Sequence, residues 1–168
     1  MKKLYAPWRS KYVTEDVHGK KAVADKDHCV FCTQFSEDED ERYLILQRTE
    51  RCAVMMNLYP YNAGHLLILP LAHHANLSDL SVDERSELME LTNRSIEIVK
   101  ASIKPDGFNL GMNLGKAAGA GIPSHLHLHV LPRWEGDTNF FPLLADTKAV
   151  SCDLREIYKE LRSVFVIR

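Results

Sequence analysis

The sequence contains no apolar segment approaching the roughly 20 residues that a membrane-spanning helix needs, so we expect no membrane partner. The basic residues at its start are followed by no apolar run, which argues against a signal peptide. The net charge is only −2, which gives no sign of the broad basic surface typical of non-specific nucleic-acid binding. These absences favour a cytoplasmic protein without nucleic acid as a partner, in which local donors bind any anionic substrate.

Cysteine is scarce as well, and the four thiols, Cys29, Cys32, Cys52 and Cys152, are expected to be reduced in the cytoplasm. Cys29 and Cys32 have the Cys-x-x-Cys spacing of a metal site, although a redox pair or two unrelated core residues would have the same spacing. A redox motif of this type usually lies near a βαβ pattern, which is missing here. A closed zinc site would need two further ligands from elsewhere in the chain. Cys52 and Cys152 fit core or surface thiols.

The length of 168 residues and a hydrophobic content of 45% suit one domain with a core of its own. Neither internal repeats nor a linker are evident, so we expect a single domain over 1–168, with an arm and loop at 1–28. The acidic run at 37–41 is interpreted as a solvated loop. Short apolar segments bounded by turn residues predict the strands. We expect strands at 43–47, 52–56, 65–69, 108–113 and 125–131.

One long helix is predicted over 82–103. Ser81 and Glu84 have the spacing of a capping box at its start, and Pro105 follows its end. A second helix is expected at 154–165. Strands surrounding one long helix predict an α+β domain with an antiparallel sheet rather than a parallel doubly wound sheet.

Three histidines alternate with apolar residues between Ser124 and Val130. Side chains of a strand alternate between its two faces, so His125, His127 and His129 are expected on one face, about 7 Å apart. Imidazoles in such a row can surround a phosphate or a metal ion. An exposed polar face that happens to be histidine is the alternative, and the neighbouring glycine-rich loop at 115–121 argues against it.

The pattern His, apolar, His, apolar, His, apolar, apolar at 125–131 resembles the motif of the histidine triad family of nucleotide-binding enzymes. Residues 4–9, 115–121 and 132–140 resemble signatures of its bacterial branch, the diadenosine tetraphosphate phosphorylases. The resemblance implies the histidine triad fold, with a five-stranded antiparallel sheet, one long helix and a shorter C-terminal helix. It also implies a homodimer with adjoining sheets.

The resemblance assigns chemical roles to the triad. The middle histidine, His127, would be the nucleophile that carries the nucleotidyl group. One of its ring nitrogens would be held as a donor by a backbone oxygen near His125. His129 would donate to a phosphoryl oxygen. Asn57 matches a position that hydrogen-bonds the ribose, and Asn113 matches an asparagine near the α-phosphate.

The segment 113–124, which ends at Ser124, is interpreted as a phosphate cradle. Gly119 and Gly121 would allow backbone N–H groups to approach an anion, whereas a flexible surface loop is the plainer alternative. His65 follows Gly64 where relatives place a histidine near the site, but an ordinary half-buried histidine is equally compatible. Trp134 could pack over the base, across a subunit interface or within the core.

Zinc-containing members of the family imply a ligand set of Cys29, Cys32, His73 and His125. A shift of one residue would replace His73 by His74, and this ambiguity stays open in the sequence. Magnesium or manganese could accompany a polyphosphate substrate, although the chain shows no dedicated carboxylate cluster for such an ion.

The resemblance therefore implies cleavage of dinucleoside polyphosphates through a nucleotidyl-histidine intermediate. Many hydrolases of the family carry glutamine just after the loop glycine, where this chain has Ile122. That difference favours phosphorolysis, in which phosphate accepts the nucleotidyl group. Hydrolysis of dinucleoside polyphosphates or nucleoside phosphoramidates is the alternative within the same class. A regulatory nucleotide-binding module is the alternative of another class, although pure binding needs no nucleophile.

Overall fold

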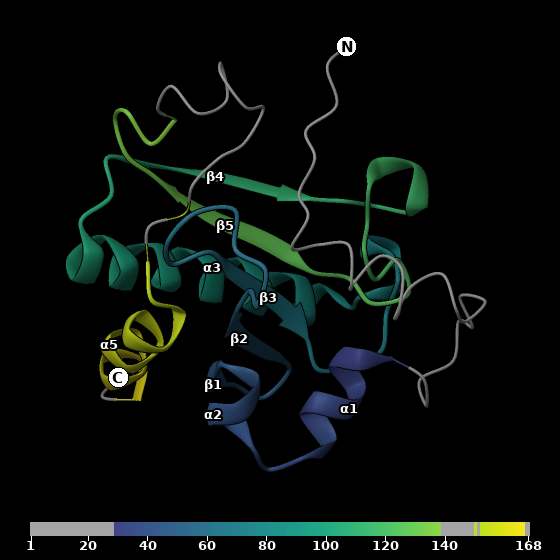
Figure 1. Cartoon of the computed structure of the whole chain (residues 1–168). Helices are drawn as coiled ribbons and strands as arrows, with labels where there is room; N and C mark the ends of the chain where they lie inside the picture. Colours follow the sequence, from purple (N-terminus) through teal and green to yellow (C-terminus); the bar gives the residue numbers. More distant parts are fainter. Residues whose placement is uncertain (1–28, 139–149, 151, 167–168) are drawn as a thin grey trace.

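The computed structural model describes residues 29–138, 150 and 152–166 (Figure 1). The expected N-terminal arm at 1–28, with its signature at 4–9, lies outside the described residues. The last two positions of the 132–140 signature lie outside them as well.

Five strands form one sheet in the order β1-β2-β3-β5-β4, and every neighbouring pair is antiparallel. This confirms the predicted antiparallel α+β architecture, with strand ends within two residues of most expected positions. The strands are β1 Ile45–Arg48, β2 Cys52–Met56, β3 Leu66–Pro70, β4 Gly107–Met112 and β5 Leu128–Arg133.

The long helix α3 spans Val82–Ile103, as the sequence predicted. At its start the Ser81 hydroxyl accepts from the Glu84 N–H, while the Glu84 carboxylate accepts from the Ser81 N–H. These reciprocal bonds satisfy two polar groups that a helix end otherwise leaves open. One face of α3 is buried: Leu88, Leu91, Thr92, Ser95, Ile98 and Val99.

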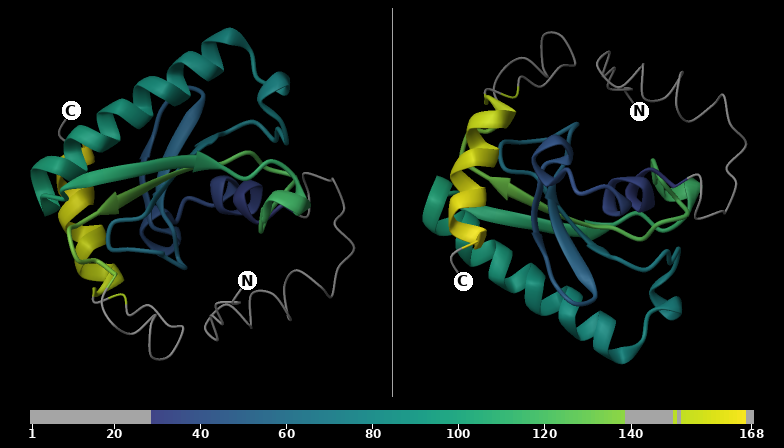
Figure 2. Two further views of the ribbon diagram at one scale, coloured as in Figure 1. Left: turned by 90° about the horizontal axis from the view of Figure 1, so that it is seen from above. Right: turned by 90° about the horizontal axis from the view of Figure 1, so that it is seen from below.

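The sheet separates two apolar clusters because successive strand residues point to opposite faces. Helices α3 and α5 (Leu154–Val166) cover one face, where Val54, Ile68 and Val130 contribute to the larger cluster. The short helix α1 (Val30–Ser36) packs on the opposite face, which the views from above and below show (Figure 2). The sequence did not predict α1.

The acidic run at 37–41 is only partly the solvated loop that we expected. Asp40–Tyr43 forms a short helix, α2, and Asp40 Oδ1 lies 2.8 Å from Arg48 Nη2. Arg48 is half-buried at the end of β1, and its guanidinium also donates to the Phe35 carbonyl at 2.7 Å. Partial burial of the Arg48 guanidinium is unfavourable unless a carboxylate pairs with it, and Asp40 does so.

The triad strand was expected at 125–131, and both of these ends were wrong. Strand β5 begins only at Leu128 and includes Pro132, which lies opposite Phe108 of β4. The Pro132 carbonyl accepts from Asn62 Nδ2 and therefore points away from β4. The backbone nitrogen of a strand residue points to the same edge as its carbonyl, so the Pro132 nitrogen also points away from β4. A missing N–H on that side removes no bond to β4.

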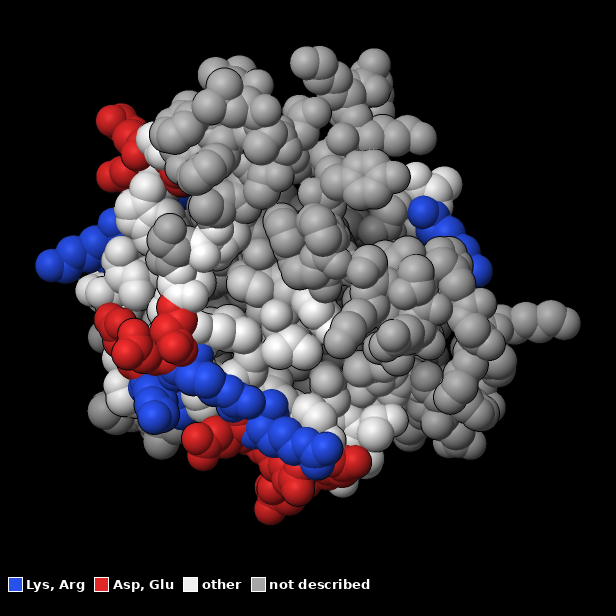
Figure 3. Space-filling model, in the orientation of Figure 1, with Lys and Arg blue, Asp and Glu red and all other residues white. Residues whose placement is uncertain are grey.

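No helix in the described ranges is both long and apolar enough to cross a membrane. On the face seen in Figure 3, Lys and Arg side chains lie next to Asp and Glu side chains, mainly along one edge. The described part of this face therefore has no continuous basic area that would attract a polyanion over a distance.

Candidate functional site

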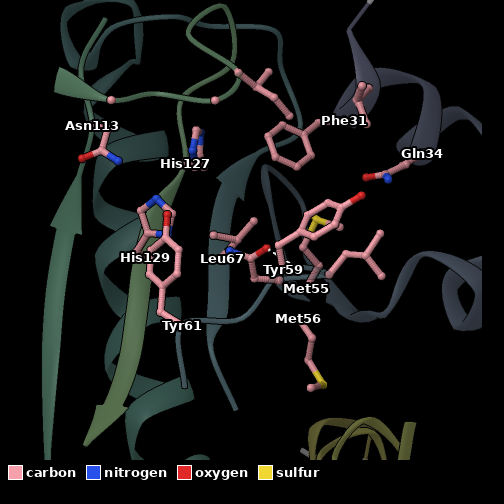
Figure 4. Close-up of a pocket in the computed structure, with 16 residues that line it drawn as sticks. Phe31, Gln34, Met55, Met56, Tyr59, Tyr61, Leu67, Asn113, His127 and His129 are labelled. Carbon is pink, nitrogen blue, oxygen red and sulfur yellow. Dashed lines mark hydrogen bonds between the residues drawn. The ribbon is translucent and has the colours of Figure 1, made fainter. Parts of the chain in front are cut away.

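A cavity of about 220 Å³ lies between α1 and the strand that carries the histidines (Figure 4). A water molecule occupies roughly 30 Å³ in the liquid, so the cavity can hold a small organic ligand rather than a few waters. The lining residues are Val30, Phe31, Gln34, Met55, Met56, Asn57, Leu58, Tyr59, Tyr61, Leu67, Asn113, Gly119, Gly121, Ile122, His127 and His129.

His127 is buried at the wall of this cavity, with 7% of its surface exposed. Its Nδ1 lies 2.8 Å from the His125 carbonyl oxygen, which can only accept, so Nδ1 carries the proton. Burial lowers the pKa of His127, so the ring is neutral near pH 7. Nε2 therefore keeps its lone pair, as a nucleophile requires. This is the hydrogen bond to His125 that the family pattern implied.

A second chain of hydrogen bonds fixes the tautomer of His129. The Tyr61 N–H donates to His65 Nδ1 at 3.2 Å, so the proton of a neutral His65 is on Nε2. Nε2 of His65 lies 2.9 Å from His129 Nδ1 and donates to it. His129 then carries its own proton on Nε2, as a donor for an anion. His65 is fully buried and does not line the cavity, but its Nε2 contacts His129, which does.

The turn before His65 is held rigidly. Gly64 has a φ of +67°, and a Cβ at this position would lie 2.6 Å from Ile103 Cδ1. The left-handed backbone favours glycine here, whereas the close approach is only to the flexible end of the Ile103 side chain. Asn62 Nδ2 donates to Pro132 O at 2.9 Å and to Asp137 Oδ2 at 2.8 Å, which ties the turn to the end of β5. The hydrogen bond from Arg133 lowers the pKa of Asp137.

Four side chains gather as a candidate metal centre beside the cavity. The ligand atoms of Cys29, Cys32, His73 and His125 all lie within 4.8 Å of one another. Sγ of Cys32 is 3.2 Å from His73 Nδ1, and Sγ of Cys29 is 3.4 Å from His125 Nδ1. Tetrahedral zinc with bonds of roughly 2.0–2.3 Å places its ligand atoms about 3.3–3.8 Å apart, so these residues fit a zinc ion.

Neighbouring groups orient the two histidines of this cluster. His125 Nε2 donates to the Pro70 carbonyl at 2.9 Å, which leaves Nδ1 facing the thiols. Burial lowers the pKa of His125 to about 4, so its ring is neutral, as a metal ligand must be. His74 Nε2 instead lies 3.6 Å from Glu84 Oε1 and is not part of the cluster. The structure thus brings His73, and not His74, to the site.

Helix α1 links the candidate metal centre to the cavity. Cys29 and Cys32 flank Phe31, whose ring lies 5.4 Å from the His125 ring and 5.5 Å from the His127 ring, between centroids. Gln34, on the next turn, also lines the cavity. Sequence analysis missed Phe31 and Gln34 as site residues. Phe31 and Gln34 are three residues apart and so share one face of α1, but this spacing carries no signal where no helix is expected.

Most, but not all, of the remaining predicted site residues line the cavity. Asn57, Asn113, Gly119 and Gly121 line the cavity, whereas Ser124 does not. The Asn57 oxygen already accepts from the Tyr59 N–H at 2.9 Å, so a ribose hydroxyl would share this oxygen.

Gly119 has a φ of +87°, and its N–H donates to Lys116 O at 3.0 Å. Glycine is therefore required there for the shape of the turn. Trp134 does not line the cavity either, and its Nε1–H donates to the Lys104 carbonyl at 3.2 Å.

Comparisons with known proteins agree with this geometry. The family model described as the HIT domain matches residues 39–136. The AP-4-A phosphorylase of Mycobacterium tuberculosis is 35% identical over 156 residues, which cover 93% of this chain and 80% of that protein. The bis(5'-adenosyl)-triphosphatase of Saccharomyces cerevisiae is 32% identical over 92 residues, covering 54% and 44%. A Zn-bound histidine triad family protein from Mycobacterium smegmatis superposes with a TM-score of 0.70 at 26% identity, covering 85% of this chain and 96% of that one.

Proposed function

The chain belongs to the HIT domain family, and we propose that it cleaves dinucleoside polyphosphates through a nucleotidyl-histidine intermediate on His127. The observation that carries this proposal is the 2.8 Å hydrogen bond from His127 Nδ1 to the His125 carbonyl, in a ring that lines the cavity. This bond holds the proton on Nδ1, so Nε2 is unprotonated and available for attack.

In the first half-reaction, Nε2 of His127 attacks the α-phosphorus. A P–N bond forms, and the P–O bond to the remaining polyphosphate breaks. The Nε2–H of His129 donates to a phosphoryl oxygen and stabilises the negative charge that develops there. Asn113 and the backbone near Gly121 lie in the same cavity and would contact the other phosphate oxygens.

In the second half-reaction, inorganic phosphate attacks the phosphorus of the intermediate, so the P–N bond breaks and His127 is restored. Ile122 lines the cavity and offers no polar group that could position water. Similarity to a protein named AP-4-A phosphorylase supports the same direction. Similarity to a bis(5'-adenosyl)-triphosphatase, over a shorter segment, keeps hydrolysis as the second candidate.

Chromatography of the products tests the proposal. With diadenosine tetraphosphate and phosphate we expect ATP and ADP, whereas hydrolysis yields ATP and AMP. Formation of AMP at the same rate with and without phosphate would replace the phosphorylase by the hydrolase. Binding without turnover under either condition would favour the regulatory nucleotide-binding module.

We propose that Cys29, Cys32, His73 and His125 hold zinc in a structural site, because two thiolates and two imidazoles form a common closed zinc ligand set. Zinc would supply a crosslink between α1, the segment after β3 that carries His73, and the loop before β5 that carries His125. None of the described residues that line the cavity is Asp or Glu, so magnesium or manganese would arrive bound to the polyphosphate.

We further propose a cytoplasmic homodimer, with neither nucleic acid nor membrane among its partners. Support for the dimer comes from β4, which lies at the edge of the sheet and exposes 48% of Leu110. An edge strand of this kind can pair with the same strand of a second copy.

A further inference from the structure

The end of the cavity opposite the histidines is apolar apart from the Gln34 carboxamide and the Tyr59 hydroxyl. Figure 4 shows Asn113, His127 and His129 at one end, and Phe31, Met55 and Gln34 at the other. A flat heteroaromatic ring packs well between aromatic and thioether side chains. With the phosphates at the histidines, the nucleobase of the substrate would therefore lie beside Gln34.

The Gln34 carboxamide is not fully used within the protein. Its Oε1 is buried and has no hydrogen-bond partner in the described part of the chain. A buried acceptor without a donor opposes folding, so an oxygen of this kind in a cavity wall suggests that a ligand supplies the donor. Gln34 lies two residues after Cys32, so the candidate metal centre fixes the helical turn that carries it.

We propose that Gln34 is the specificity-determining residue for the nucleobase and that it selects adenine. This rests on the proposed nucleotide cleavage. Oε1 accepts from the 6-amino group, while Nε2 donates to an adjacent ring nitrogen, a two-point match that carboxamides make with adenine. Rotation about the terminal side-chain torsion of Gln34, which is soft in glutamine, would turn Oε1 toward the base.

These two hydrogen bonds between Gln34 and adenine predict a lower affinity for a purine that lacks the amino group. Such a purine leaves Oε1 buried and without a donor, which a site built for a hydrogen bond penalises. The penalty applies to this single group because the ring shape and the phosphate are unchanged. We expect AMP to bind roughly tenfold more tightly than purine riboside 5'-monophosphate.

Titration calorimetry of the full-length, metal-loaded protein with these two nucleotides tests the assignment. In Gln34→Leu the ratio of the two dissociation constants should fall close to one, because leucine cannot distinguish the amino group. Gln47→Leu is the matched control. Gln47 also has a buried Oε1 without a partner among the described residues, but it is in β1 and does not line the cavity. This variant should keep the wild-type ratio.

Loss of folding does not obscure the result, because wild-type protein alone must show the preference. Replacing an unpartnered buried amide by leucine is also expected to leave the melting temperature unchanged or higher. Equal affinity of wild type for both nucleotides, with cleavage of diadenosine tetraphosphate intact, would overturn the role of Gln34 and leave the proposed function standing. An unchanged preference in Gln34→Leu would overturn it equally. Failure to bind either nucleotide or to cleave the dinucleotide would overturn both.

Discussion

The backbone oxygen of His125 accepts the Nδ1 proton of His127 at 2.8 Å, while the ring of His125 points its own Nδ1 toward Cys29 Sγ, 3.4 Å away. One residue thus connects the candidate metal centre to the proposed nucleophile. A metal ion on this ring would hold the carbonyl that sets the tautomer of His127. The connection is covalent and short, so loss of the metal should disturb the orientation of His127 in the cavity as well as the stability of the fold.

Zinc is expected at about one ion per chain, and Cys32→Ser should lower both zinc content and stability. Structural zinc couples its binding free energy to folding. The domain also has a large apolar core, so the variant should still fold. We expect its free energy of unfolding to fall by several kcal/mol and its melting temperature by more than about 5 °C. Elemental analysis and thermal unfolding with and without chelator measure these effects.

Cys152→Ser is the control for Cys32→Ser, since it removes a half-buried thiol outside the cluster. It should melt close to wild type and retain the metal. Gently purified wild-type protein without zinc, or with unchanged stability in chelator, would contradict the structural role of the ion.

His127→Ala should reduce turnover by more than about 10⁴-fold, because it removes the nitrogen that forms the P–N bond. Binding of AMP should remain measurable, since the apolar end of the cavity is unchanged. Mass spectrometry of quenched wild-type reactions should reveal one adenylyl group on the protein, and the variant should lack it. Turnover of purified His127→Ala near the wild-type rate would rule out the covalent mechanism.

Local sequence patterns determine much of this fold. The capping box at Ser81 located the long helix, and the alternation between His125 and Val130 predicted which side chains face the core. Helix α1 could not be predicted in this way. Seven residues are too few to be stable on their own, and this helix depends on packing and on the ligand cluster at its start.

The choice between His73 and His74 was equally inaccessible to sequence analysis. The two residues are adjacent, and the path of the loop decides between them. The Leu126 N–H donates to the His74 carbonyl at 2.6 Å, and the His74 ring lies against Glu84. The role of Gln34 was hidden for the same reason, because it follows from a helix that only tertiary contacts stabilise.

Asp137→Asn should destabilise the protein most at neutral pH. Hydrogen bonds from Arg133 and Asn62 lower the pKa of Asp137 in the folded state. A carboxyl group with a lowered folded-state pKa stabilises the fold above its unfolded pKa of about 3.9, and this stabilisation is lost as the pH falls further. Denaturant unfolding of both proteins between pH 7 and pH 2.5 should show the difference shrinking below about pH 4. A difference that is independent of pH would contradict the role of the charge.

His65 is expected to act as a positioning residue for His129. Through Nε2 it donates to His129 Nδ1, and so it leaves the His129 proton on the nitrogen that would face the phosphate. Replacement by leucine removes the donor, whereas glutamine can keep an N–H near the place of Nε2. We expect His65→Leu to lower kcat by about 10²-fold, the size of a lost donor at a developing charge, and His65→Gln to retain several times more activity than His65→Leu.

A purely structural role of His65 would give a different result from this tautomer role. Nitrogen-15 NMR of the imidazole rings should show His129 protonated on Nε2 in wild type and in His65→Gln, and a mixture of tautomers in His65→Leu. Because AMP binding relies on the distant apolar end of the cavity, its dissociation constant should change much less than kcat. If both variants lose the same activity while His129 keeps one tautomer, His65 serves only to fill the core. If kcat follows the tautomer of His129 across the three proteins, the hydrogen bond between these two histidines is what prepares the site for the negative charge of the reaction.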